Sequence, residues 1–110
     1  MTAPMPDDPV LREIVARLVS AVDPERLILF GSRARGTGGP DSDYDILIVK
    51  GESEPALRRT GPLCRKLRGI PKPVDLLWFT PEEVADWSAV RQHVISQAVR
   101  TGLVVYEKAL

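Results

Sequence analysis

The run Asp43–Val49, D-Y-D-I-L-I-V, constrains the fold of this chain more than any other segment. Its β-branched residues favour a strand. The two-residue period of a strand places Asp43 and Asp45 on one face, together with Leu47 and Val49. Two carboxylates side by side repel each other and need a partner of opposite charge. Because their Cα atoms would be ~6.7 Å apart, both could converge on divalent ions.

Helix and strand patterns alternate along the rest of the chain. Apolar residues recur at helical spacing from Val10 to Val22, after Asp8 as N-cap. The sequence Thr80-Pro81-Glu82-Glu83 combines an N-cap, a first-turn proline and a capping-box glutamate. The other predicted elements are, in chain order, a strand Arg26–Phe30, a loop from Gly31 to Pro40, a helix Glu54–Arg68 kinked or divided by Pro62, a strand Val74–Phe79, a helix from Pro81 that breaks near Ser88 and restarts to stop at Gly102, and a strand Leu103–Tyr106.

Length and composition predict one domain over residues 1–110. Of the 110 residues 44% are hydrophobic, which suffices for one core. Strands interleaved with helices in so short a chain predict an α+β fold, in which helices cover a mixed sheet mainly on one face. The one cysteine, Cys64, and the one histidine, His93, exclude an internal disulfide, a Cys/His zinc site and Cys-His or Ser-His catalysis.

The charge pattern does not lead us to expect a nucleic acid or a membrane as partner. Fifteen Lys and Arg residues balance fifteen Asp and Glu residues. The basic stretch from Lys50 to Lys72 has no interleaved aromatic residues, and it fits the solvated face of a helix better than an RNA site, although an acidic partner could also dock there. Met1–Pro9 lacks the features of a signal peptide, and no apolar run approaches the ~20 residues of a bilayer span. We expect a cytoplasmic protein.

The loop after the first strand begins F-G-S-R-A-R-G, from Phe30 to Gly36. Gly31 lets backbone N–H groups approach an anion closely, and Ser32 adds a hydroxyl donor. The guanidinium groups of Arg33 and Arg35 can pair with phosphate oxygens. On its own the pattern is explained better by a solvated Gly-Ser turn with surface arginines. Since no G-K-[ST] follows, a Walker loop is excluded.

Asp75 stands in the segment V-D-L-L-W-F, which otherwise has the apolar character of a strand. An unpaired carboxylate is costly to bury, so Asp75 is expected to be hydrogen-bonded, ion-paired or bound to a metal. Considered alone, a salt bridge to a local Arg or Lys explains it as well as a metal does. With Asp43 and Asp45 on a neighbouring strand the metal becomes the better explanation, and three acids from two strands predict a magnesium site.

Together these residues resemble the signature of the DNA polymerase beta nucleotidyltransferase superfamily. Gly31-Ser32 is followed after ten residues by Asp43-x-Asp45, and a later strand supplies Asp75. Within that superfamily, the short length, the preceding helix and the G-S-R-A-R-G segment resemble the minimal nucleotidyltransferase (MNT) proteins. The resemblance implies a polymerase-beta-like nucleotidyltransferase fold. It also implies magnesium-dependent transfer of AMP from ATP to a hydroxyl, with release of pyrophosphate.

The resemblance also implies a role for each site residue. Asp43 and Asp45 would bind two Mg²⁺ ions that neutralise and align the triphosphate of ATP. Asp75 would complete the metal site, either as a ligand only or also as the general base for the acceptor hydroxyl. The phosphate contacts would come from Gly31, Ser32, Arg33 and, as a further helper, Arg35.

The same resemblance suggests the acceptor. MNT proteins are commonly paired with a separate HEPN protein in two-component toxin-antitoxin systems, in which the MNT member attaches AMP to the toxin. We therefore expect a HEPN toxin as partner, with a tyrosine hydroxyl as target, in a type VII-like system. The chain continues only a short way after Asp75, so we expect the partner to supply the acceptor platform. Two alternatives stay open: a stand-alone transferase acting on a small molecule or an RNA end, and a catalytically idle antitoxin that acts by binding.

Overall fold

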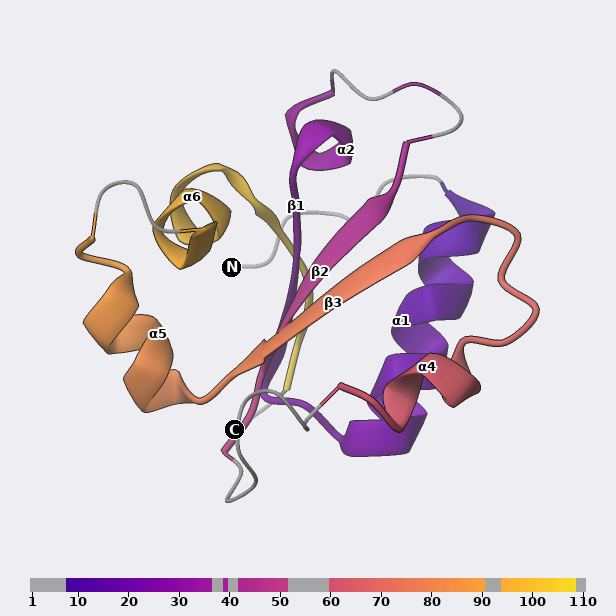
Figure 1. Ribbon diagram of the computed structural model, residues 1–110, viewed down its shortest axis with the longest axis horizontal. Coiled ribbons are helices and arrows are strands. Elements are labelled where there is room, and N and C mark those ends of the chain that lie inside the picture. Colours follow the sequence, from indigo (N-terminus) through magenta and orange to yellow (C-terminus); the bar gives the residue numbers. More distant parts are fainter. Residues whose placement is uncertain (1–7, 37–38, 40–41, 52–59, 91–93, 109–110) are drawn as a thin grey trace.

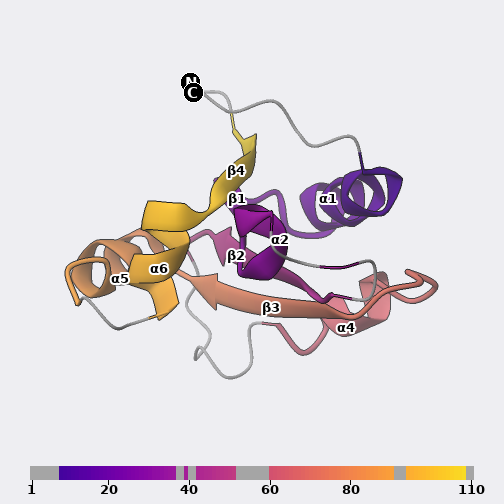
Figure 2. The ribbon, with the colours of Figure 1, turned by 90° about the horizontal axis from the view of Figure 1, so that it is seen from above.

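The computed structural model describes residues 8–36, 39, 42–51, 60–90 and 94–108. Its elements, with the labels of Figure 1, are α1 (Pro9–Val22), β1 (Arg26–Phe30), α2 (Ser32–Arg35), β2 (Tyr44–Val49), α4 (Leu63–Lys66), β3 (Val74–Phe79), α5 (Pro81–Trp87), α6 (Val94–Thr101) and β4 (Leu103–Glu107). The described strands form one sheet in the order β3-β2-β1-β4, and Figure 2 shows β4 and β3 at its opposite edges. β1 pairs antiparallel with β2 and β4, whereas β2 pairs parallel with β3. The predicted mixed sheet and α+β class are confirmed.

Helices cover both faces of the sheet (Figure 1). The larger core lies under α1 and α4, where buried residues of α1 such as Leu11, Ile14 and Leu18 pack against Leu27 and Ile46 of the strands. α5 and α6 cover the other face over a smaller cluster that includes Ile28, Leu47, Val49 and Ala98. The prediction of helices mainly on one face therefore describes the larger core, and the structure adds a second, thinner layer.

Local sequence signals set the ends of the helices that were predicted best. The Asp8 carboxylate accepts hydrogen bonds from the backbone N–H groups of Val10 and Leu11 at the start of α1. At the start of α5 the predicted capping box is present: Thr80 N–H donates to the Glu83 carboxylate at 2.8 Å, and Glu83 N–H donates to the Thr80 hydroxyl at 3.1 Å. Each pair satisfies backbone donors that a helix start leaves unpaired.

Two predicted elements differ from the structure by more than one residue. The loop after β1 contains a one-turn helix, α2, between two glycines of positive φ, Gly31 and Gly36. Of the predicted helix Glu54–Arg68, the structure shows only Leu63–Lys66 behind Pro62, while residues 52–59 lie outside the described part. The restarted helix spans Val94–Thr101 and stops before Gly102 as predicted, although residues 91–93 are likewise outside that part. No helix in the described ranges is both long and apolar enough to cross a membrane.

Candidate active site

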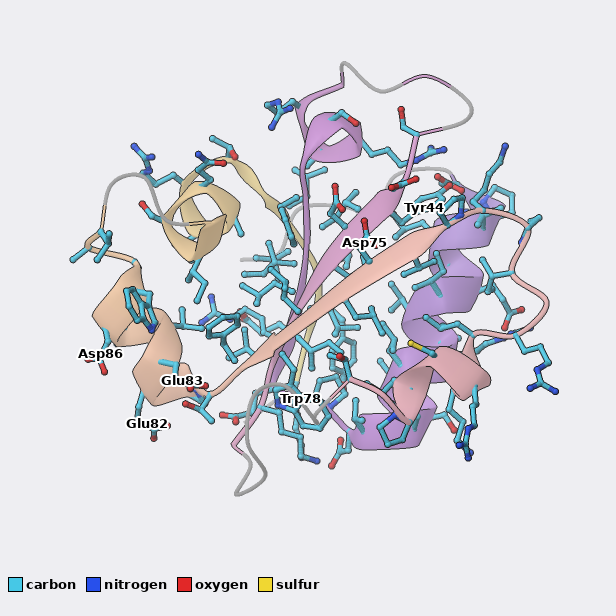
Figure 3. The ribbon with its side chains drawn as sticks, in the orientation of Figure 1. Tyr44, Asp75, Trp78, Glu82, Glu83 and Asp86 are labelled. Atoms are coloured by element: carbon cyan, nitrogen blue, oxygen red, sulfur yellow. The ribbon has the colours of Figure 1, made fainter. Side chains whose placement is uncertain are left out.

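The end of β1 and the starts of β2 and β3 meet at one end of the strands, here called the sheet edge, because β1 is antiparallel to β2 and β2 is parallel to β3. In this register Phe30 lies opposite Asp45, and Asp45 lies opposite Asp75. Paired residues of neighbouring strands point to the same face. The two carboxylates therefore stand side by side on the face of the smaller core, and Figure 3 shows Asp75 on β3 beside β2.

The carboxylate of Asp45 is half-buried among negative charges. Burial raises the pKa of Asp45 above its usual value, and the charges of Asp75 and Asp43 and a hydrogen bond shared with Asp75 raise it further. Arg35 opposes this effect on the pKa by its positive charge. The site thus concentrates like charge, which is the arrangement that favours a bound cation.

Asp43 is the third predicted acid, and it lies one residue before β2 with an exposed side chain. It is close enough to Asp45 for its charge to act on that carboxyl group. In the ranges that the structure describes, however, no three His, Cys, Asp or Glu side chains are gathered as a metal site. The structure therefore brings Asp45 and Asp75 together and leaves Asp43 beside the pair.

Gly31 joins this site through its backbone. Its φ of 78° and ψ of −159° belong to a region that is essentially restricted to glycine. A Cβ on Gly31 would collide with a carboxylate oxygen of Asp45 and lie 3.2 Å from the carboxyl carbon. The missing side chain is thus the space that the Asp45 carboxylate occupies.

The other predicted phosphate ligands lie on α2, directly after Gly31. Ser32 is half-buried in its first position, and Arg35 is exposed at its end. Arg33 turns toward α1 instead: its Nε donates to the Ser42 carbonyl at 2.8 Å, and its Nη1 lies 3.8 Å from Asp8. The phosphate contacts of Gly31, Ser32, Arg33 and Arg35 stay predictions, and Arg33 has partners within the protein that no local pattern indicates.

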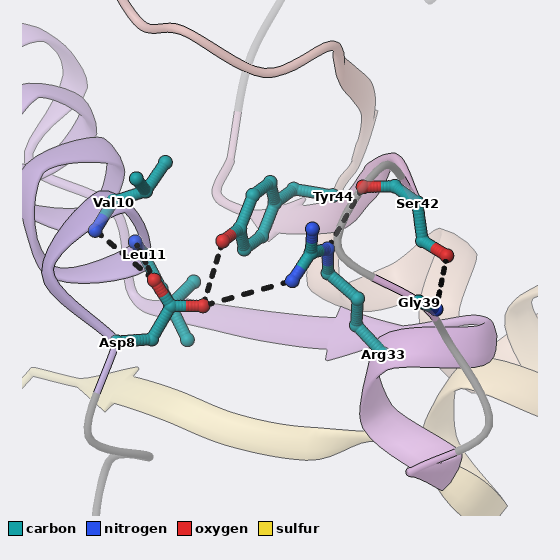
Figure 4. A network of polar contacts seen from close by, with 7 residues as sticks. All are labelled: Asp8, Val10, Leu11, Arg33, Gly39, Ser42 and Tyr44. Atoms are coloured by element: carbon teal, nitrogen blue, oxygen red, sulfur yellow. Dashed lines mark hydrogen bonds and ion pairs between the residues drawn. The ribbon is translucent and has the colours of Figure 1, made fainter.

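Sequence reasoning missed Tyr44, whose contacts join distant segments (Figure 4). Tyr44 is 2% exposed, and its hydroxyl donates to Asp8 Oδ2 at 2.6 Å. Burial and the neighbouring Asp8 raise the pKa of Tyr44 to about 12. Burial acts to raise the pKa of Asp8, but hydrogen bonds from Tyr44, Leu11 and Val10, aided by the charge of Arg33, outweigh it and lower that pKa. The N-cap motif indicated one half of this arrangement, and no local pattern could indicate the contact with Tyr44.

Comparison with known proteins agrees with this geometry. The sequence matches the family model for the nucleotidyltransferase domain over residues 10–101, so the chain belongs to that family. A crystal structure of a Sulfolobus solfataricus protein assigned as a nucleotidyltransferase is similar, with a TM-score of 0.64 and 27% identity over 90% of this chain and 78% of the other. Among curated proteins none matched the sequence. The chain is therefore a nucleotidyltransferase domain with a polymerase-beta-like fold, and domains of this family generally use a nucleoside triphosphate and a divalent metal.

The residues present fit a magnesium ion. Mg²⁺ prefers oxygen ligands and is commonly bound through one or two carboxylates together with the phosphates of its substrate. Asp45 and Asp75 supply such a pair, and the charge of Asp43 acts on the same site. A complete cage of protein ligands is not required, because the triphosphate supplies further oxygens.

Proposed function

We propose that this protein is a magnesium-dependent adenylyltransferase that moves AMP from ATP to a hydroxyl, most specifically a tyrosine hydroxyl of a HEPN toxin met in the cytoplasm. The observation that carries the proposal is the opposition of Asp45 and Asp75 beside Gly31, at the edge where β1 ends and β2 and β3 begin. The resemblance of G-S-R-A-R-G to MNT proteins supports the role as antitoxin and the choice of partner.

The residues of the site divide the reaction between them. Asp43, Asp45 and Asp75 would hold Mg²⁺, which when bound neutralises the triphosphate and lowers the pKa of the acceptor hydroxyl. The acceptor oxygen attacks the α-phosphorus of ATP and forms a new O–P bond. The bond from that phosphorus to the bridging oxygen breaks, and pyrophosphate leaves with the electron pair. The acceptor proton passes to Asp75 or to solvent.

The exposure of the acids favours a large acceptor. Asp43 and Asp75 are both exposed at the sheet edge, so a side chain on the surface of another protein can reach them. Gly31 and Ser32 would lie against the phosphates on the side of β1, leaving the side of β3 for the acceptor. A tyrosine on a partner satisfies this geometry because it projects several atoms beyond its own backbone.

The test is transfer from α-labelled ATP in the presence of Mg²⁺ and the product of the adjacent reading frame. We expect label on that partner, abolished by Asp43→Ala and by replacing the acceptor tyrosine with phenylalanine. Asp86→Ala is the matched control, because it removes an exposed acid from α5, away from the sheet edge. Label on RNA or a small molecule alone would favour the stand-alone enzyme. Tight binding with no label would favour the idle antitoxin.

A further inference from the structure

The Arg33 side chain is almost fully used in contacts with the protein itself. It is 17% exposed, its Nε donates to the Ser42 carbonyl oxygen at 2.8 Å, and its guanidinium carbon lies 4.0 Å from the centroid of the Tyr44 ring. Its Nη1 lies 3.8 Å from Asp8 Oδ2. The cation therefore has a carbonyl, an aromatic face and a carboxylate as partners (Figure 4).

Asp8 is fixed as firmly as Arg33. One carboxylate oxygen accepts from the N–H groups of Val10 at 3.0 Å and Leu11 at 3.1 Å, and the other accepts from the Tyr44 hydroxyl at 2.6 Å. The start of α1, the start of β2 and the helix α2 are thus joined through one carboxylate, one phenol and one guanidinium.

These contacts fall on both chain neighbours of Asp43. Arg33 donates a hydrogen bond to the carbonyl of Ser42, which belongs to the peptide bond between Ser42 and Asp43. Asp8 accepts a hydrogen bond from the hydroxyl of Tyr44, the residue between Asp43 and Asp45 in the chain. Because successive strand residues point to opposite faces, Tyr44 is anchored under α1 while Asp45 points to the other face.

We infer that Arg33 and Asp8 are positioning residues, which act through Ser42 and Tyr44 to fix the backbone that presents Asp43 and Asp45. The inference rests on the proposed function for what Asp43 and Asp45 do in catalysis. The placement of these two acids by Arg33 and Asp8 does not depend on that function. It assigns Arg33 to the support of the metal site and not to direct contact with phosphate. Residues that orient metal ligands in this way change metal affinity or activity by about 10- to 100-fold when replaced.

The test compares Arg33→Lys and Tyr44→Phe, singly and together. Arg33→Lys keeps the charge but loses the planar group over Tyr44, and Tyr44→Phe keeps the ring but loses the hydroxyl that Asp8 accepts. Two quantities are measured: the affinity for Mn²⁺ without nucleotide, by electron paramagnetic resonance, and kcat and KM for ATP in the transfer assay. Mn²⁺ is the probe because it takes carboxylate ligands as Mg²⁺ does.

We expect each single variant to weaken Mn²⁺ binding and to lower kcat, both by about 10-fold, with KM for ATP nearly unchanged. The Mn²⁺ affinity and kcat of the double variant should be no lower than those of the more impaired single variant, because both changes break the same network. If Arg33 were a phosphate ligand, Arg33→Lys would raise KM for ATP and leave the Mn²⁺ affinity unchanged. Tyr44→Phe alone would then have no effect, and the double variant would behave like Arg33→Lys. That result would overturn the inference.

A further test variant and its matched control lie at the two ends of α1. Asp8→Asn keeps an N-cap of equal quality but removes the charge beside Arg33, and it should move both readouts in the same direction as Tyr44→Phe. Asp23→Asn removes the exposed ion pair with Lys108 at a φ of 48° that asparagine tolerates, and it should leave both readouts at their wild-type values. Asp8→Asn decides the matter if Tyr44→Phe fails to fold. Absence of transfer in the wild type would refute the proposed function, whereas the Mn²⁺ measurement would still test the positioning role.

Discussion

Two groups of charged residues meet on either side of the first residues of β2, and they are built in opposite ways. Around Asp8 each charge has a complement: the pKa of the carboxyl is lowered, and Tyr44 and Arg33 are its partners. Around Asp45 the nearest carboxylates are of like charge, and the pKa is raised. The first group stabilises the fold as it stands. The second concentrates like charge, which is the arrangement expected where function opposes stability.

The largest effect should come from removing one acid of the second group. Asp45→Asn is expected to lower nucleotidyl transfer by at least about 100-fold, the scale seen when a group that stabilises transition-state charge is lost. The same change relieves the repulsion with Asp75, so the metal-free protein should gain about 0.2–1 kcal/mol of stability. Transfer of labelled AMP and urea unfolding in EDTA measure the two quantities, with Asp86→Asn as control. A variant that loses stability would place Asp45 in the structural group instead.

A second prediction concerns the glycine that makes room for Asp45. Gly31→Ala and Gly36→Ala both place a side chain at positive φ, at 78° and 76°, but only the first would meet the Asp45 carboxylate. Gly36→Ala should cost about 1–2 kcal/mol for the backbone conformation alone. Gly31→Ala should cost more, because its ψ of −159° lies in a region restricted to glycine and because Asp45 must move. The displacement of Asp45 should also lower transfer at least tenfold. Equal losses of unfolding free energy and of transfer in both variants would show that a side chain at residue 31 does not act through Asp45.

The smallest effect should appear in the first group at high pH. The pKa of Tyr44 is raised to about 12 from 10.0, so the folded protein holds this proton more tightly than the unfolded chain. The stability that this provides is present below pH 10.0 and is lost as the pH rises toward about 12. Absorbance titration of tyrosinate should show one late group near pH 12, and Tyr44→Phe should remove it. A titration without that late group would mean that Asp8 and Tyr44 are not joined in solution.

Those parts of the fold that depend on neighbouring residues could be predicted from the sequence. The caps at Asp8 and Thr80 and the apolar runs of β1, β2 and β3 are local signals. Each element begins at its signal except β2, which begins at Tyr44, one residue after the predicted Asp43. α2 was missed because a single turn is too short to show a helical period. Trp78 is buried in the core, whereas Trp87 is 42% exposed. The residue type alone could not distinguish these two positions.

The candidate site was predictable to a similar degree. The two-residue period placed Asp45 on the correct face, and the apolar surroundings of Asp75 singled that residue out. The burial expected for Asp75 was wrong, because its side chain is exposed near the start of β3. What the sequence could not provide is the partner of Arg33, since Asp8, Arg33 and Tyr44 come together only through tertiary packing. A charged residue near a glycine-rich turn has several possible partners, and the choice among them is made by the whole fold.

The parallel pairing of β2 with β3 also governs when the protein becomes competent during folding. The antiparallel pairing of β1 with β2 brings Asp45 to the end of β1 while Asp75 is still in an unpaired segment. Parallel strands require a long crossover to close first, so their pairing is slow compared with local contacts. A newly made chain is therefore expected to form the contacts around Tyr44 before it brings Asp75 beside Asp45.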